Sequence, residues 1–589
     1  MAAMFQVERL LEAKYPTLAS RPDLITRPAI AFLRKLLRED EVNAFLAQSR
    51  DLEGNEFIDR ILEHFNFSYS VVGREIENIP AEGRVVIVAN HPLGLLDGVA
   101  LLKLVREVRP DVRMVANDVL LQFHPPEGLI LPVVNIGRGF NKENVLAIHA
   151  ALEHDEAVIV FPSGEVSRAG PRGIRDGRWH AGFLSFAERA HAPILPVRLD
   201  GRNSALFYGV STFLKTVSAF MLVDEAYRQR ASTLPIRIGE LIPWRALEAL
   251  ALPRREKIRH VANQVYGIGK KSVARLRTEK AVAHPEDRLA LRRELQQAQR
   301  LGETVDGKRI LLFDGHASST VMREVGRLRE LSFRQVGEGT GKRRDIDAFD
   351  AWYRHVLLWD DEELQIVGAY RVGDVREILA ARGAKGLYTE GLFSYSGAML
   401  DYLPRSLELG RSFVQPRYRG KRSLEYLWYG IGAYLRRRPD VRYLFGPVSI
   451  SAELPQAARE MLVHFYRRHF GAPRGLALAR APYVIDDAIR AKCDALFPGD
   501  DHERDFRTLK RLLAEMDCAV PTLYKQYTDL CEPGGACFLE FGVDAGFNGC
   551  IDGLVLVDLE KMRPAKRSRY LEASGRLALA ASVTLRKSA

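Results

Sequence analysis

Cysteine is scarce in this sequence of 589 residues and is confined to its C-terminal part. No two cysteines have the C-x-x-C spacing of zinc-binding or redox motifs, and an odd number does not suit a disulfide framework. The five are Cys493, Cys518, Cys531, Cys537 and Cys550. We therefore expect no zinc site, and a reducing, cytoplasmic environment.

A long hydrophobic run is also missing. Residues 1–23 mix acidic and basic residues with apolar ones, and they lack the uninterrupted apolar segment that a signal peptide needs. The most apolar later stretches, 128–136 and 207–223, are too short or too interrupted to cross a bilayer as helices. We therefore expect any membrane contact to be peripheral, on the inner face of the cell membrane.

Neither a low-complexity tract nor a repeat of fixed period is present, and the hydrophobic share of 47% is that of a folded protein. The length exceeds what one hydrophobic core supports, so we expect two domains of roughly 250 to 300 residues each. The net charge of +11 favours an anionic partner. Charge alone does not choose among nucleic acid, lipid headgroups and an acidic carrier protein.

Short apolar runs alternate with helical spacing in the first half of the chain. The runs at 85–89, 157–161 and 194–197 are typical of buried strands, and 144–152 has the apolar spacing of a helix. Strands that alternate with helices predict an α/β domain.

The alternation ends near residue 244, which gives the expected domain limits. We assign residues 1–269 to the first domain and the charged, helical stretch 270–308 to a connector. The second domain is expected over 309–589, beginning with the apolar run at 310–313. Whether 493–589 completes this domain or forms an interaction surface stays open.

A histidine and a carboxylate stand where the first buried strand ends. In residues 90–97, NHPLGLLD, His91 follows the strand and Asp97 lies six positions later, where a helix is expected to start. A neutral imidazole can take a proton from an attacking hydroxyl, while the carboxylate orients the ring and stabilises the imidazolium. The structural alternative is a helix-capping Asp97 beside an ordinary loop histidine.

Two later turns carry groups that suit an anion. Residues 161–168, FPSGEVSR, contain Ser163, Gly164 and Glu165, and backbone amides of this turn can hold a phosphate or a developing oxyanion. Arg138 offers a guanidinium to an anionic headgroup. A plain surface turn and a solvated charge are the structural alternatives.

The order of these blocks resembles the glycerolipid acyltransferase family over residues 71–244. The resemblance implies that His91 is the base, that Asp97 orients it, and that the 163–165 turn helps to bind the acceptor. It also implies a thioester acyl donor and no metal. Two departures, an extra residue between His91 and Asp97 and Ser163 in place of the usual glutamate, indicate a subfamily rather than a standard lysophosphatidate enzyme.

In the second half, an expected strand at 407–414 leads into the basic segment 415–423, QPRYRGKRS, and then into a helix expected over 424–435. A basic turn at a helix N-terminus is a plausible cradle for a phosphate, including that of phosphopantetheine. A basic surface loop is the alternative.

This basic segment resembles the acyl-donor loop of GNAT N-acyltransferases. The R/Q-x-x-G-x-G/A pattern of that loop is matched by Arg417 and Gly420 and broken by Arg422. The departure favours an acyl carrier protein over coenzyme A, because Arg417, Arg419, Lys421 and Arg422 would complement an acidic surface.

The wider region 321–451 resembles the ornithine lipid N-acyltransferase family and, more distantly, the acyl-homoserine lactone synthases. The matching features are RELSFR at 329–334, the acidic series Asp345, Asp347 and Asp350, and Glu408 with Arg411. The resemblance implies a GNAT-like α+β fold and amide formation on an amine derived from an amino acid.

Attack by such an amine on a thioester needs a base, because the free α-amine is mostly protonated at neutral pH, and Glu408 is the candidate. A structural ion pair between Glu408 and Arg411, a candidate for substrate binding, is the alternative. Asp345, Asp347 and Asp350 can receive the side-chain ammonium of ornithine, or they can cap and solvate a helix.

Together the resemblances imply a bifunctional ornithine lipid synthase. Its C-terminal domain would join ornithine to a 3-hydroxyacyl thioester, and its N-terminal domain would then esterify the 3-hydroxyl group. No bound cofactor is expected; the co-substrates are thioesters of acyl carrier protein or coenzyme A. The expected partners are the carrier protein, ornithine and a membrane lipid surface, and not nucleic acid.

Other acceptors stay open at this point, namely glycine, another amino acid or a lysophospholipid. A non-enzymatic membrane-binding protein is a further alternative, against which the presence of both His91 and Asp97 argues. The segment 337–342, GEGTGK, has too short a glycine spacing for a P-loop, and Arg343 replaces the required Ser or Thr. We therefore reject nucleotide triphosphate binding.

Overall fold

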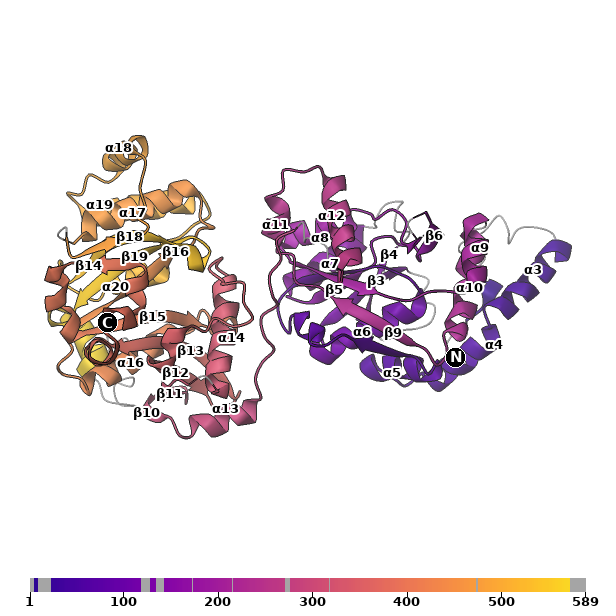
Figure 1. Cartoon of the computed structure of the whole chain (residues 1–589), viewed down its shortest axis with the longest axis horizontal. Coiled ribbons are helices and arrows are strands. Elements are labelled where there is room, and N and C mark those ends of the chain that lie inside the picture. The colour runs from indigo at the N-terminus through magenta and orange to yellow at the C-terminus, as the bar shows by residue number, and fades with distance from the viewer. Residues whose placement is uncertain are drawn as a thin grey trace, which may run out of the picture. The chain divides into compact units, whose positions relative to one another are not determined.

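The computed structural model of the chain divides into two compact units, Met1–His284 and Pro285–Ala589 (Figure 1). It describes residues 5–8, 23–117, 128–133, 142–171, 173–213, 215–270, 276–316, 318–472 and 475–572. The boundary between the units falls within the expected connector 270–308. Its residues 288–295 form a helix, and 299–303 form the edge strand of the second sheet.

The first unit is built on a seven-stranded sheet with the strand order β1-β9-β8-β2-β5-β3-β4. Neighbouring strands are parallel except for β8 and β9. The strands are β1 (Ser68–Val71), β2 (Val85–Ala89), β3 (Val112–Asn117), β4 (Ile130–Val133), β5 (Ala157–Val160), β8 (Ile194–Leu199) and β9 (Thr233–Ile238). A separate hairpin joins β6 (Arg168–Gly170) to β7 (Gly173–Arg175).

Helices cover both faces of this sheet, because its central strands are apolar on both sides. Along β2, Val85 and Ile87 pack into one core cluster, and Val86 and Val88 pack into another on the opposite face. The helices are α3 (Asp23–Leu36), α4 (Glu39–Gln48), α5 (Gly54–His64), α6 (Leu95–Val108), α7 (Lys142–Glu153), α8 (Gly182–Ala190), α9 (Ala205–Phe213), α10 (Lys215–Arg228), α11 (Trp244–Glu248) and α12 (Arg254–Gly267). The predicted α/β architecture is confirmed, since continuous apolar strands require cover on both faces.

The second unit contains an eight-stranded sheet with the order β10-β11-β12-β13-β15-β16-β19-β18. All neighbours are antiparallel except β15 and β16, which pair in parallel at only three positions. The strands are β10 (Gln299–Glu303), β11 (Arg309–Asp314), β12 (Arg354–Asp360), β13 (Gln365–Asp374), β15 (Ser406–Val414), β16 (Tyr443–Ile450), β18 (Ala536–Asp544) and β19 (Cys550–Asp558). Two short strands, β14 (Phe393–Tyr395) and β17 (Ala477–Ala479), pair separately.

Alternation along the strands of this second sheet sends side chains to two core clusters. In β11, Ile310 and Leu312 join one cluster, whereas Leu311 and Phe313 join the other, which lies under α14. The helices are α13 (Arg288–Leu295), α14 (Thr320–Arg334), α15 (Val375–Arg382), α16 (Ser423–Arg436), α17 (Gln456–Phe470), α18 (Asp487–Leu496), α19 (His502–Ala514), α20 (Thr522–Thr528) and α21 (Pro564–Arg567). The predicted α+β architecture is therefore confirmed.

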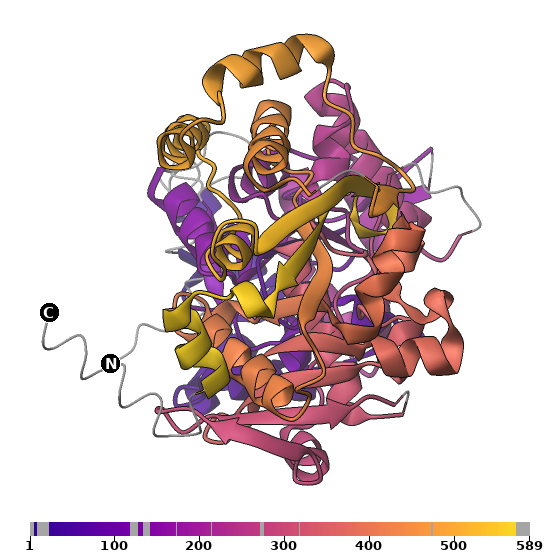
Figure 2. The ribbon, with the colours of Figure 1, turned by 90° about the vertical axis from the view of Figure 1, so that its left-hand side faces the viewer.

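The C-terminal segment, whose role the sequence left open, completes the second sheet. β19 pairs with β16 over its whole length, and β18 forms the outer edge; both lie toward the yellow end of the colour scale in Figure 2. A two-for-one bulge in β15 places Arg411 and Ser412 opposite Tyr370. Arg411 takes the left-handed φ of 50° at this bulge.

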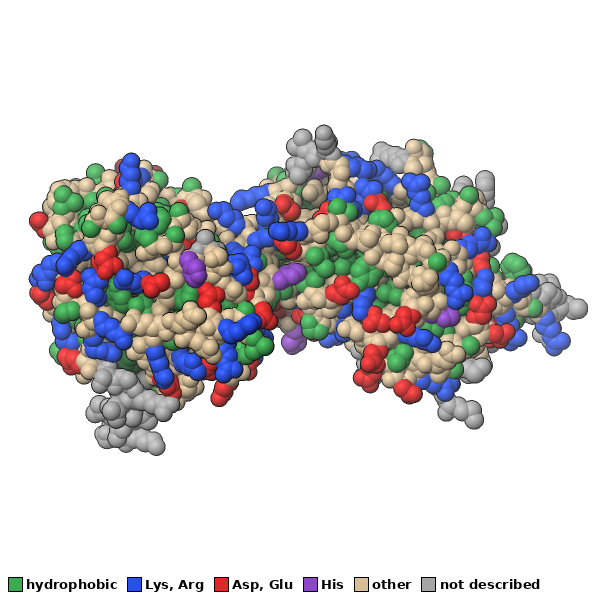
Figure 3. Space-filling view, turned by 60° about the horizontal axis from the view of Figure 1, so that its bottom comes forward, with side chains coloured by type: hydrophobic (Ala, Val, Ile, Leu, Met, Phe, Trp, Pro, Cys, Tyr) green, Lys and Arg blue, Asp and Glu red, His purple; other side chains and the backbone are tan. Residues whose placement is uncertain are grey.

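Charged side chains of both signs are interspersed on the face drawn in Figure 3, so the positive net charge does not gather into one patch there. Within the described ranges, no helix has both the length and the apolar character needed to span a bilayer.

Candidate active sites

His91 and Asp97 meet in the first unit, at the carboxyl end of β2 and in the first turn of α6. Nδ1 of His91 lies 3.0 Å from Oδ1 of Asp97, whose side chain is 0% exposed. The other carboxylate oxygen accepts backbone N–H groups from Leu93 at 2.7 Å and Gly94 at 3.3 Å. The extra residue between the pair is accommodated at Gly94, whose φ of 99° tightens the turn so that the two side chains still face each other.

The contact with Asp97 also fixes which nitrogen of His91 can act. With Nδ1 held by the carboxylate, Nε2 is the ring nitrogen left for a substrate hydroxyl. The ring packs on Phe161 with centroids 4.2 Å apart, and its side chain keeps 20% of its surface exposed. Burial lowers the pKa of His91, but the charge and contact of Asp97 outweigh it and leave the pKa raised above its usual value. The pair is therefore suited to accept a proton and to stabilise the resulting cation.

Asp176, which the sequence reasoning missed, binds the backbone of His91 through its side chain. Its Oδ1 accepts the His91 backbone N–H at 3.1 Å and the Ser167 hydroxyl at 2.5 Å, and Oδ2 accepts Trp179 Nε1 at 3.1 Å. The Ser167 backbone N–H donates to the carbonyl of His91 at 2.7 Å. No local motif marks Asp176, since only the fold brings the hairpin region beside the end of β2.

The turn at 163–165 closes on itself in the structure. The buried Ser163 hydroxyl donates to the Glu165 carbonyl at 2.6 Å, and the Gly164 N–H donates to the Phe161 carbonyl at 3.1 Å. Glu165 is exposed and lies 3.5 Å from Arg168. The roles of Ser163, Gly164 and Glu165 in acceptor binding stay predictions. Arg138 lies outside the described residues.

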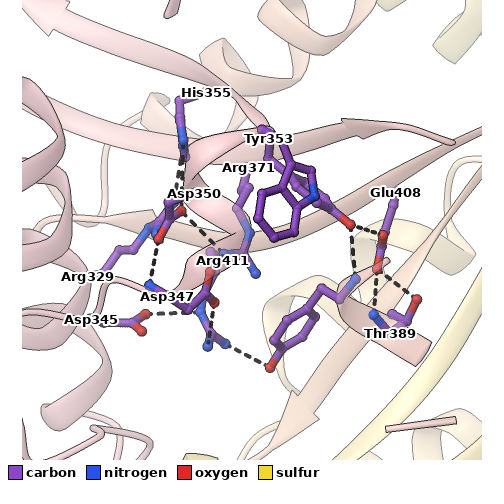
Figure 4. Close-up of polar contacts among 12 residues, drawn as sticks. Arg329, Asp345, Asp347, Asp350, Tyr353, His355, Arg371, Thr389, Glu408 and Arg411 are labelled. Atoms are coloured by element: carbon purple, nitrogen blue, oxygen red, sulfur yellow. Dashed lines mark hydrogen bonds and ion pairs between the residues drawn. The ribbon is translucent and has the colours of Figure 1, made fainter. Parts of the chain in front are cut away.

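In the second unit, the carboxylates of the acidic series pair with three arginines of the protein itself (Figure 4). The sheet and α14 bring together these six side chains, which we call the ion-pair network: Arg329, Arg371, Arg411, Asp345, Asp347 and Asp350.

The side chains of the network are buried except for those of Asp347 and Arg411, which are partly exposed. Asp350 accepts from Arg329 at 2.8 Å and from Arg371 at 3.3 Å. Asp347 accepts from Arg371 at 2.6 Å, and Arg411 lies 3.0 Å from Asp345 and 3.6 Å from Asp347. Asp350 also accepts the Asp347 backbone N–H at 2.9 Å, so it caps the short helix η3 (Ala348–Ala351) as well. In this arrangement the three carboxylates neutralise protein guanidinium groups, and ornithine binding by them stays a prediction.

The charges of this network polarise one another. Burial raises the pKa of the Asp350 carboxyl, but Arg329 and Arg371 outweigh it and hold the pKa well below its usual value. Burial, followed by the charge of Arg329, lowers the pKa of His355 to about 3, and Arg329 approaches its Nδ1 at 3.2 Å. His355 is therefore a neutral acceptor at physiological pH.

Glu408 lies beside the network but does not pair with Arg411. Its carboxylate accepts the Tyr353 hydroxyl, and it accepts the Thr389 backbone N–H at 2.8 Å and hydroxyl at 2.7 Å. The alternative expected from the sequence, an ion pair between Glu408 and Arg411, does not form. Arg411 pairs with Asp345 and Asp347 instead, because the β15 bulge turns its side chain toward them. Burial raises the pKa of Glu408, which is 2% exposed.

Three further buried carboxyl groups, which the sequence reasoning missed, lie near Arg411 and Tyr388. We call Glu338, Asp544 and Asp552 the inner carboxyl cluster. Burial raises the pKa of Glu338 to about 7 and that of Asp552 to about 8, and the charge of Arg411 opposes both shifts. Tyr388 links the two sets, since its hydroxyl lies 3.1 Å from Arg411 and 3.3 Å from Asp544.

The basic turn lies between β15 and the N-terminus of α16, as predicted. Its cationic side chains are exposed, and three of them contact neighbours: Arg417 pairs with Glu363 at 2.8 Å, Arg422 pairs with Glu425 at 2.8 Å, and Arg419 donates to Gln335 at 2.9 Å. Among the described residues Lys421 has no acidic partner; its ammonium lies 5.3 Å from the Tyr418 ring. Gly420 takes a φ of 75°. Donor binding by this turn stays a prediction.

Two family descriptions match the chain, one in each unit. The family described as "Acyltransferase" matches residues 9–274, and the family described as "Acetyltransferase (GNAT) domain" matches residues 328–429. Each match includes the site found there, with His91 and Asp97 in the first and Glu408 and Arg411 in the second.

Curated relatives carry activities of both kinds. A glycine N(alpha)-acyltransferase of Bacteroides thetaiotaomicron is 31% identical over 49% of this chain and 89% of its own length. A lyso-glycine lipid O-acyltransferase of the same organism is 31% identical over 42% of this chain and 92% of its own length. An L-ornithine N(alpha)-acyltransferase of Rhizobium meliloti is 40% identical over 21% of this chain and 42% of its own length.

The names of these relatives thus include transfer of acyl groups both to oxygen and to nitrogen. The chain is an enzyme that belongs to the acyltransferases, sharing its families with the lyso-glycine lipid O-acyltransferases and the glycine N(alpha)-acyltransferases, with an acyltransferase domain followed by a GNAT domain.

Proposed function

We propose that this chain makes an amino-acid lipid, ornithine lipid, in two consecutive acyl transfers. The second unit acylates the α-amine of ornithine with a 3-hydroxyacyl thioester, and the first unit esterifies the 3-hydroxyl of that product with a second acyl chain. The observation that carries the proposal is the 3.0 Å contact between His91 and the buried Asp97, in a chain that also has a GNAT domain.

The esterification follows from the orientation of His91. The substrate hydroxyl donates to Nε2, which takes its proton as the oxygen attacks the thioester carbonyl. The carbon–sulfur bond breaks, and the imidazolium returns the proton to the leaving thiolate. Asp97 stabilises the imidazolium, while Asp176 holds the His91 backbone in place.

Amide formation needs a route for the proton of the amine. Glu408 is our proposed acceptor, and because it is 2% exposed, the route runs through neighbouring hydroxyls. The Thr389 hydroxyl donates to Glu408, and the hydroxyl of the partly exposed Tyr395 donates to Thr389 in turn. This chain of hydrogen bonds connects the buried carboxylate to a position that a substrate amine can reach.

Two kinds of donor and a membrane surface complete the proposal. The donors are thioesters of acyl carrier protein or coenzyme A, and the basic turn in the second unit holds the 3-hydroxyacyl donor of amide formation. The single-chain product is amphiphilic, so we place the enzyme on the inner face of the cell membrane, where that product can diffuse from one site to the other.

A reconstitution tests the proposed order directly. Purified protein is given ornithine, a 3-hydroxyacyl thioester and a second acyl thioester, and the lipids are followed by mass spectrometry. We expect a two-chain ornithine lipid, and we expect Glu408→Gln to suppress the single-chain amide from which it is made. If wild-type protein forms no amide with ornithine from either donor, the proposal fails at its first step.

Glycine is the second candidate acceptor, because this chain matches two glycine N(alpha)-acyltransferases over most of their length. The inner carboxyl cluster favours ornithine, since a nearby cation stabilises buried carboxylates and ornithine brings a second ammonium. We expect Asp552→Asn to raise KM for ornithine by roughly 10- to 100-fold and to leave any activity with glycine unchanged. Kinetics with both amino acids measure this.

Asp558→Asn is the matched control for that variant. It makes the same change on β19, where Asp558 accepts from Arg442 rather than facing Arg411. An equal rise in KM for both amino acids with Asp552→Asn would show that Asp552 does not recognise the second ammonium.

The pH dependence of esterification follows from the raised pKa of His91. Only neutral imidazole acts as the base, so the rate with a supplied single-chain lipid rises with pH through that pKa. In Asp97→Asn the raising charge is lost, so the acidic limb of the profile moves to lower pH while the maximal rate falls. Rates measured from pH 5 to 9 check both changes; an unshifted limb would mean that His91 does not set the profile.

A further inference from the structure

A cavity of about 1120 Å³ in the first unit is lined by arginine side chains, together with aromatic ones. It lies between the β6–β7 hairpin region and α12, and its aromatic lining residues are Trp179 and Tyr266. Six of the lining residues are arginines: Arg168, Arg175, Arg178, Arg254, Arg255 and Arg259. The volume is sufficient for a small-molecule ligand.

The positive charge of this arginine cavity is only partly balanced by the protein. Arg254 pairs with Glu188 at 3.1 Å and Arg259 with Glu256 at 3.2 Å. Within the described part of the chain, Arg175, Arg178 and Arg255 form no ion pair with an acidic residue. Arg175 instead lies over the Tyr266 ring, 4.7 Å from its centroid.

Among the described residues that line the cavity, Asp176 is the only acidic one, and its carboxylate already accepts hydrogen bonds. Its Oδ1 accepts from Ser167 and from the backbone of His91, and its Oδ2 accepts from Trp179. It therefore has little capacity to neutralise the three unpaired guanidinium groups, and the cavity favours an anionic ligand.

The cavity and the His91 site share a wall. Asp176 lines the cavity and also accepts the His91 backbone N–H, and Trp179 lines the cavity while donating to Asp176. A ligand in the cavity is thus separated from the histidine by one bonded side chain. This position suits a substrate of the esterification better than an unrelated effector.

We infer that the arginine cavity binds the phosphate of the pantetheine arm of the acyl donor used in esterification. This inference rests on the proposed function of the first unit. The acceptor is the weaker match, because N-acylornithine carries a carboxylate beside its side-chain ammonium and so has no net charge, whereas the cavity is strongly cationic. The donor carries anionic phosphate at the far end of its arm, as a diphosphate in coenzyme A and as a phosphodiester in a carrier protein.

The test uses the full chain with the charge of two unpaired arginines removed, Arg178→Gln/Arg255→Gln. Esterification of a supplied single-chain lipid is measured with acyl coenzyme A and with acyl carrier protein, and free coenzyme A is titrated by calorimetry. We expect KM for the preferred donor to rise roughly tenfold or more, with kcat and KM for the lipid nearly unchanged. The donor with the larger rise identifies the source of the phosphate.

The control is Arg60→Gln/Arg74→Gln, which removes the same charge from exposed positions of the first unit outside the cavity. Unchanged KM for both donors in the Arg178/Arg255 variant overturns the inference, as does a rise in KM for the lipid alone. A selective loss of binding to vesicles of anionic phospholipid also overturns it, since the cavity would then be a membrane contact.

His91→Ala keeps the inference and the proposed function separable. It should bind coenzyme A as the wild-type protein does, although it does not esterify. If it esterifies normally, the proposed function falls whatever the arginine variants show; if it is inactive while the arginine variants bind normally, only the inference falls.

Discussion

His91→Ala is expected to stop ester formation and to make the single-chain amide accumulate. The loss of a positioned general base lowers such a rate by roughly 100- to 10,000-fold, and no other described side chain holds a ring nitrogen against Asp97. The second unit is unaltered, so amide formation continues at its usual rate. Mass spectrometry of the reconstituted reaction measures both products at once.

His154→Ala provides the matched control for this prediction. His154 is exposed after α7, where its Nδ1 contacts the Ala150 carbonyl, and its loss should change neither product. If His91→Ala produced the two-chain lipid at the normal rate, esterification would have to occur elsewhere and the division of labour would be wrong.

Asp350→Asn is expected to destabilise the second unit strongly. The substitution leaves the buried Arg329 and Arg371 without one of their carboxylates, and breaking a buried pair costs about 3–5 kcal/mol. Because the pKa of Asp350 is lowered in the folded state, its contribution is present near neutral pH and is lost as pH falls through the folded pKa. Hydrogen exchange of β12 and β13 measures the loss of stability in the unit itself.

Two references accompany that measurement. Exchange in β2 and β5 of the first unit should stay unchanged, and Asp487→Asn, which removes an exposed partner of Arg490, should cost less than about 1 kcal/mol. Equal exchange in Asp350→Asn and wild-type protein near neutral pH would show that the network contributes little to stability.

The two strand ends that carry the first site could be predicted from local pattern. The all-apolar run at 85–89 is a strand because it is buried on both faces, and the helix after it places Asp97 near His91 whatever the rest of the chain does. The spacing of the motif therefore contained most of this geometry. Asp176 could not be found in the same way, because its contact with His91 depends on the hairpin region that follows β5.

The second site was harder to predict because its residues come from four elements. The sequence reasoning found the acids at 345–350 but not their partners, since Arg329, Arg371 and Arg411 lie on α14, β13 and β15. The pairing of Glu408 with Thr389 and Tyr353 has the same origin. Side chains this far apart in sequence meet only after the sheet has formed.

The glycine-rich segment at 337–342 shows the same limit. Its amides do converge on an anion, as a glycine-rich loop allows, but the anion is the protein's own Glu330. That carboxylate accepts the backbone N–H groups of Thr340 at 3.1 Å and Gly341 at 2.9 Å. The rejection of a P-loop therefore has a structural counterpart in an internal carboxylate that fills the cradle.

The sequence by itself determined the elements of this protein, the alternation that buries each sheet on both faces, and the meeting of His91 with Asp97, because these depend on residues close together along the chain. Only the tertiary structure decided which arginine neutralises which carboxylate, where the domain boundary falls, and that an arginine cavity shares a wall with the histidine. Those outcomes depend on long-range packing, which sets the distances between charges and therefore their energies.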